Sequence, residues 1–175
     1  MGEDEKAVFR VVIRGTIERV WREITKTDEL QQCFFNMWLD TDGLRPGGQI
    51  RMRSPGRKNT PIIGEVLEFQ PPHRYVHTFR FTQFDDPPCT VIHELKEVEG
   101  GVEYTLTHTN LPPGTRTARQ MNQGGPMICQ TLKAVVERGR PSFGVRVLHV
   151  LFRVLEPLTP KKCRSENWSV DRRPS

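Results

Sequence analysis

The feature that most constrains the fold is a series of short, alternating apolar and polar runs between residues 37 and 111, separated by turn residues. Alternation with a period of two is typical of strands that bury one face. The turns between the runs are too short for parallel crossovers, so the strands must pair as antiparallel neighbours. The runs are RPGGQIRMRS, IIGEVLEFQ, RYVHTFRFTQF, CTVIHELKEV and GVEYTLTHTN.

A strand and two helices are expected before this region. Residues 7–14, AVFRVVIR, alternate and predict the first strand. Thr16 belongs to a residue type that caps helices, so a helix is expected directly after it. A second short helix is expected from about residue 27 or 28 to residue 35. The apolar residues at helical spacing in the first helix are Ile17, Val20, Trp21 and Ile24.

A single long helix is predicted after the strands, over residues 117–138. Gly124, Gly125 and Pro126 are poor helix formers, so a kink or a late start is expected there. A sheet with one buried face needs a cover, and this helix is the one element long enough to supply it. The sequence therefore predicts an α+β fold, in which a curved antiparallel sheet of about six to seven strands grips the long helix.

Charge divides the chain into two parts. Residues 1–137 carry 17 lysines and arginines against 18 acidic residues, whereas residues 138–175 carry nine against three. The net charge of +5 therefore belongs to the C-terminal segment, which argues against a basic nucleic-acid groove across the domain. We expect one domain over residues 1–138 and a basic appendage over residues 139–175.

The chain is expected to be a cytoplasmic protein. Its first residues are acidic, and it has no apolar run long enough to span a bilayer. The cysteines show no C-x-x-C pair, so a zinc site or a disulfide framework is not indicated, and each is expected to be a free, buried thiol. They are Cys33, Cys89, Cys129 and Cys163.

Four motifs resemble the START-like SRPBCC superfamily: ERVWREIT, LRPGGQIRMR, GEVLEFQPPHRYVHTFRF and GVEYTLTHTNLP. They are most similar to the branch that includes the C-terminal domain of the activator of the heat-shock protein 90 ATPase, over about residues 7–137. The resemblance implies a helix-grip (Bet v-like) fold, which hosts lipid carriers, other hydrophobic-ligand binders, polyketide cyclases and co-chaperone modules. Phe34 and the Gly125-Pro126 pair stand where this branch usually has tryptophans, so the identity of a ligand cannot be transferred.

The expected pocket lies between the sheet and the long helix. Strand parity directs one histidine inward from each of three strands, His77, His93 and His108. A hairpin loop at residues 99–101 would place His93 directly opposite His108. The ligand-pocket candidates are Phe34, Tyr75, His77, Phe79, Phe81, His93, Tyr104, His108, Met121 and Ile128.

The three histidines leave several interpretations open. They could anchor a ligand, act as a general base or form half of a metal site, or they could be ordinary hydrogen-bonded residues of the cavity wall. Neither a carboxylate of the same parity nearby nor a known catalytic motif accompanies them. No catalytic residue, metal or cofactor is assigned, and we expect a non-enzymatic domain that binds a small hydrophobic ligand. A protein-interaction module similar to the heat-shock ATPase activator is the alternative, and a cyclase or hydrolase is the third.

The basic appendage contains the segment FGVRVLHVLFRVLEPL, which predicts an amphipathic helix over about residues 142–156. Such a helix could pack on its own domain or on a second copy, lie on an anionic membrane surface, or enter the groove of a partner protein. The polar segment after it is expected to be loose, with Trp168 as a candidate anchor. The tail interaction candidates are Arg146, Leu148, Leu151, Phe152, Arg153 and Leu155.

Overall fold

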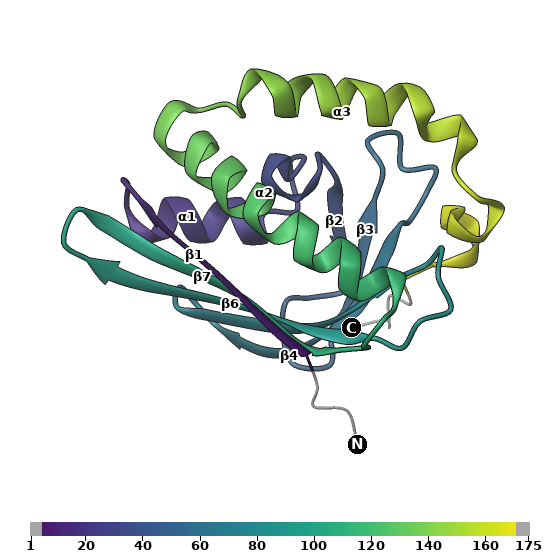
Figure 1. Cartoon of the computed structure of the whole chain (residues 1–175), viewed down its shortest axis with the longest axis horizontal. Coiled ribbons are helices and arrows are strands. Elements are labelled where there is room, and N and C mark those ends of the chain that lie inside the picture. Colours follow the sequence, from purple (N-terminus) through teal and green to yellow (C-terminus); the bar gives the residue numbers. More distant parts are fainter. Residues whose placement is uncertain (1–4, 171–175) are drawn as a thin grey trace.

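The computed structural model describes residues 5–170 and contains a seven-stranded antiparallel sheet curved around one long helix (Figure 1). The strands are β1 (Glu5–Ile13), β2 (Trp38–Thr41), β3 (Gln49–Arg53), β4 (Ile62–Gln70), β5 (Arg74–Phe81), β6 (Cys89–Val98) and β7 (Gly101–Leu111). The helices are α1 (Ile17–Thr25), α2 (Arg116–Arg138) and α3 (Phe143–Leu155), with single 3-10 turns η1 (Gln32–Phe34), η2 (Glu156–Leu158), η3 (Lys161–Cys163) and η4 (Ser165–Asn167). The strand order is β1-β7-β6-β5-β4-β3-β2, and the predicted helix-grip fold is confirmed.

The second of the two expected short helices is shorter than predicted, because only the three-residue 3-10 helix η1 forms. The preceding residues are held by other partners: Arg22 binds the Asp28 carboxylate at 3.1 Å, and Gln31 Nε2 donates to the carbonyl of Lys26 at 3.1 Å. Phe35 and Asn36 then adopt positive φ angles of 55° and 58°, which end the helical turn.

The expected late start of α2 is wrong. The Thr115 hydroxyl accepts from the Ala118 N–H at 3.1 Å and caps a helix that continues through Pro126. Gly125 has a packing role, because a Cβ at this position would lie 2.2 Å from Cε2 of Phe9. The glycine therefore permits close contact between α2 and β1.

The register of the β6–β7 hairpin differs from the predicted one. Val98 pairs with Gly101 across a two-residue turn, one residue shorter than expected, and Gly100 supplies the positive φ of 87° that the turn requires. His93 consequently pairs with Leu106, and His108 pairs with Val91. The two histidines lie diagonally rather than face to face.

The core consists of two clusters that meet under η1. One lies between α2 and the sheet around β1, β6 and β7, and includes the fully buried Tyr104 and Leu132. The other covers β2, β3 and β4. Aromatic side chains contact both clusters and join them; they are Trp21, Phe34, Phe79 and Phe81. All four cysteines are buried with free thiols.

The C-terminal segment turns back across the domain. Ser142 caps α3, which runs from the end of α2 toward the side of β2 and β3 (Figure 1). In the described part of the chain, none of the helices has the length and apolar character needed to cross a bilayer.

The residues after α3 are not loose, contrary to expectation. The Thr60 N–H donates to the carbonyl of Cys163 at 2.6 Å, and the Ser165 N–H donates to the carbonyl of Lys58 at 2.9 Å. Trp168 closes a local turn by donating its indole N–H to the carbonyl of Lys162 at 2.7 Å. Backbone pairing with the β3–β4 loop therefore holds the segment around Cys163 and Ser165 against the domain. The rest of the expected loose tail, residues 171–175, lies outside the described residues.

Candidate functional site

Four aromatic side chains stack on the concave face of the sheet, as strand parity predicted. The ring of His93 lies between those of Tyr75 and Tyr104, with centroids 5.2 Å and 6.1 Å away. The His77 ring stacks on His93 at 5.3 Å. Neighbouring inward positions of β5, β6 and β7 thus build one polar stack within an apolar core.

The stack contains a continuous hydrogen-bond chain. Tyr104 Oη lies 2.8 Å from His93 Nδ1, the Nε2 atoms of His93 and His77 are 3.2 Å apart, and His77 Nδ1 lies 2.8 Å from the Thr78 carbonyl. A carbonyl only accepts, so Nδ1 of His77 carries the proton and its Nε2 accepts from His93. His93 Nδ1 must then accept from the Tyr104 hydroxyl. All donors therefore point from Tyr104 toward Thr78.

Burial keeps this chain uncharged. Desolvation lowers the pKa of His77 to about 4, although the Thr78 carbonyl opposes the shift. Desolvation, followed by the nearby charges of His77 and His108, holds the pKa of His93 well below its ordinary value. Desolvation also raises the pKa of Tyr104. Neutral imidazoles with satisfied partners are suited to hydrogen bonding and poorly suited to holding a charged ligand.

His108 differs from the other two histidines. It is 1% exposed, and its Nδ1 is buried without a hydrogen-bond partner among the described residues. The ring of Phe9 meets it edge-on at 5.5 Å. Desolvation and the charge of His77 lower its pKa to about 4. An unpaired buried nitrogen costs about 1–3 kcal/mol, so His108 offers a ligand an unused hydrogen-bonding position.

The ten predicted pocket residues fall into two sets. Tyr75, His93, Tyr104, His108 and Met121 are buried inside the packed core. Phe34, His77, Phe79, Phe81 and Ile128 remain half-buried. We call Phe34, Phe79, Phe81 and Ile128 the aromatic rim. Phe34 connects the two sets, because its ring meets His93 edge-on at 5.7 Å.

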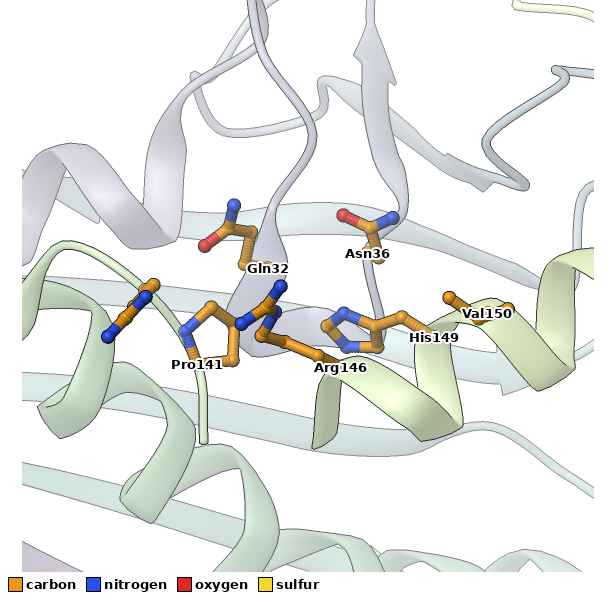
Figure 2. A pocket seen from close by; sticks show the side chains of 7 residues that line it. Gln32, Asn36, Pro141, Arg146, His149 and Val150 are labelled. Carbon is orange, nitrogen blue, oxygen red and sulfur yellow. The ribbon is translucent and has the colours of Figure 1, made fainter. Parts of the chain in front are cut away.

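A separate pocket of about 410 Å³ lies between η1 and α3 (Figure 2). Sequence reasoning singled out only Arg146 among its lining residues, because nothing in the pattern showed that α3 packs beside η1. The lining residues are Gln32, Asn36, Arg140, Pro141, Arg146, His149 and Val150.

The tail interaction candidates occupy different faces of α3. Leu148 is half-buried, and Phe152 contacts the Phe35 ring of the domain at 6.3 Å although it is 45% exposed. Arg146 lines the pocket and is exposed, and Leu151, Arg153 and Leu155 are also exposed. The outer face of α3, defined by its strongly exposed apolar residues, consists of Phe143 (79%), Val147 (51%), Val150 (62%), Leu151 (48%) and Val154 (67%).

The part of the chain that the structure describes contains no group of three histidine, cysteine or acidic residues placed to hold a metal ion.

The sequence did not predict the contact of Phe9 with His108. The inward parity of Phe9 was readable, but the pairing of β1 with β7 that brings the two rings together was not.

Comparison with known proteins identifies relatives of the fold. The family model described as Activator of Hsp90 ATPase homolog 1-like protein matches residues 14–137. Protein MLL2253 from Mesorhizobium loti is 18% identical with a TM-score of 0.64, covering 77% of this chain and 98% of that one. The Aha1 dimer from Colwellia psychrerythraea is 19% identical with a TM-score of 0.62 and the same coverage. CalU16 from Micromonospora echinospora is 22% identical with a TM-score of 0.60, covering 86% and 84%. A search of curated proteins finds no match.

Proposed function

Because this chain belongs to the Activator of Hsp90 ATPase homolog 1-like family, of the START-like fold, we propose that it binds a small hydrophobic molecule without chemical conversion. The site is the concave face of the sheet beneath η1 and α2. The observation that carries the proposal is the aromatic rim, whose partly buried side chains pack against the core, with Phe34 in edge contact with His93 of the histidine chain. Apolar walls with a few convergent polar groups are typical of ligand sites.

The ligand should be uncharged and carry one hydrogen-bonding group. The histidines are held neutral by burial, so an ionised ligand would lose its hydration without gaining a partner charge. A hydroxyl, amide or carbonyl group would pair with the free Nδ1 of His108 after the rim opens, because both ring nitrogens of His77 already have partners.

Binding of Nile red, an uncharged apolar dye, tests the location of this site. Phe79→Trp enlarges a rim side chain and should weaken dye binding at least about tenfold, since it fills the space that the dye would occupy. Val8→Trp is the matched control, because Val8 is 44% exposed on β1 and lies outside the rim. Equal binding by both variants would place the site elsewhere.

A second candidate function is attachment to an anionic membrane surface through the outer face of α3. Its support is the exposure of that face together with Arg146 and Arg153, which lie two helical turns apart along one edge. The similar Colwellia protein is described as a dimer. An antiparallel pairing of two α3 helices would align four arginines along one edge, so we favour the membrane over a second copy.

Co-sedimentation with vesicles tests this candidate. Val150→Asp with Val154→Asp should abolish binding to vesicles that contain phosphatidylglycerol, because it introduces charges on the outer face. The exposed pair Val8→Asp and Val12→Asp on β1 is the control. A different outcome is that the native chain self-associates in sedimentation velocity without binding vesicles. If the variant with Val150→Asp and Val154→Asp then no longer self-associates, the outer face of α3 binds a second copy.

A further inference from the structure

The pocket between η1 and α3 is cationic and differs in chemistry from the concave face. Of its seven lining residues, Arg140 and Arg146 carry permanent positive charges and none is acidic. Figure 2 shows Arg146 and His149 on α3 facing the η1 segment, which supplies the amides of Gln32 and Asn36. Two distant parts of the sequence therefore direct hydrogen-bonding groups at the same space.

These polar groups have no protein partners in the described chain. Neither arginine forms an ion pair with a described residue, although Arg22, Arg53 and Arg74 elsewhere are all paired with carboxylates. The side chains of Gln32, Asn36 and His149 likewise make no hydrogen bond within residues 5–170. Two unpaired guanidinium groups beside unpaired amide groups, with no carboxylate in the lining, are suited to an anion supplied from outside.

We infer that this pocket binds a phosphate monoester group. Such a group carries a charge near −2 at neutral pH and has three strongly accepting terminal oxygens, which matches two guanidinium groups with additional amide donors. A carboxylate, with a single charge and two oxygens, would balance only one of the two arginine charges. Pro141 and Val150 supply apolar contacts for the organic part of the ester.

The phosphate monoester has two possible sources, a soluble metabolite or a lipid headgroup. Val150 lines the pocket and also belongs to the exposed outer face of α3, so a headgroup could enter from a membrane beside that face. The pocket volume of about 410 Å³ also suits a small soluble ester. The inference itself requires neither a ligand on the concave face nor membrane attachment.

Calorimetric titration of the full chain with glycerol 3-phosphate tests the inference. Arg140→Gln and Arg146→Gln should each weaken binding about tenfold or more, because each removes a charge-assisted contact. Arg153→Gln is the matched control: it makes the same charge change on the same exposed helix outside the pocket, and it should change the affinity less than about twofold. Glycerate, the carboxylate comparison, should bind at least about tenfold more weakly.

Vesicles distinguish the two sources. If the native chain ignores glycerol 3-phosphate but binds phosphatidic acid vesicles in preference to phosphatidylglycerol vesicles of matched charge, and Arg146→Gln removes that preference, the source is the lipid. Three outcomes overturn the inference: no binding of either phosphate, equal losses in Arg146→Gln and Arg153→Gln, or equal affinity for glycerate.

Discussion

At the scale of single residues, the buried histidines tie the candidate ligand site to the stability of the fold. His77, His93 and His108 are neutral in the folded chain, because burial opposes the charged form of each. In the unfolded chain each would titrate near its ordinary value of about 6.5. Acid therefore favours the unfolded state.

We predict that the free energy of unfolding decreases as the pH falls from about 6.5 to about 4. Below 6.5 the unfolded chain binds protons that the folded chain does not, so stability rises with pH through this window. His77 and His108, with folded pKa values of about 4, should each cost on the order of 2 kcal/mol by pH 4.5. Urea unfolding across this pH range measures the change. A free energy of unfolding that does not vary with pH would contradict the burial of these histidines in their neutral form.

His108→Leu should stabilise the chain without a ligand by about 1 kcal/mol at pH 7. The substitution removes a buried nitrogen that lacks a partner and keeps an apolar side chain against Phe9. His73→Leu, at an exposed position, is the control. If His108→Leu lowers the free energy of unfolding and leaves the pH dependence of that free energy unchanged, then Nδ1 of His108 has a hydrogen-bond partner in solution.

Strand alternation alone predicted which residues of β5, β6 and β7 face inward, because each side chain's face is fixed by its parity. The same pattern could not predict that His93 meets His77 and Tyr104 rather than His108. That outcome depends on the two-residue turn at Glu99 and Gly100, which pairs His93 with Leu106 instead of His108.

At the scale of elements, α2 is positioned by its contact with β1. Gly125→Ala should destabilise the fold by about 2 kcal/mol, since the new Cβ would overlap the Phe9 ring. Gly124→Ala is the matched control: its Cβ would lie 3.6 Å from Phe35, an ordinary contact, and alanine favours the helix by up to about 1 kcal/mol. The unfolding temperature should therefore fall in Gly125→Ala and rise in Gly124→Ala. A change in the same direction in both variants would contradict the close contact between α2 and Phe9.

Helix spacing predicted α1, α2 and α3, but it failed at η1 and after α3. Near η1 the outcome depends on a contact beyond one helical turn, in which Gln31 pairs with Met37. After α3 it depends on a distant partner, because Cys163 pairs with Thr60. Local propensity does not include such contacts. The cationic pocket was missed for the same reason, because its residues come from η1 and from the start of α3.

At the scale of the whole molecule, charge separates the two proposed binding sites. The domain of residues 1–137 is nearly neutral, and the excess of positive charge lies after it. Raising the ionic strength from about 0.05 M to about 0.5 M should weaken glycerol 3-phosphate binding several-fold, because salt screens exposed charges. Nile red binding should not weaken under the same change. If salt weakens the binding of glycerol 3-phosphate and of Nile red to the same extent, the two ligands share a single site.

The division into a domain of residues 1–138 and a basic appendage remains a prediction. The family model ends at residue 137, while α3 and residues 161–168 contact the domain. The appendage therefore completes one pocket of the molecule and leaves the outer face of α3 exposed.

Native mass spectrometry of the chain purified from its own cells tests the central claim most directly. The account predicts a retained, uncharged apolar molecule that is lost in Phe79→Trp and kept in Val8→Trp. A spectrum that shows the polypeptide alone, from a preparation that also fails to bind Nile red, would contradict the claim that the concave face is a ligand site.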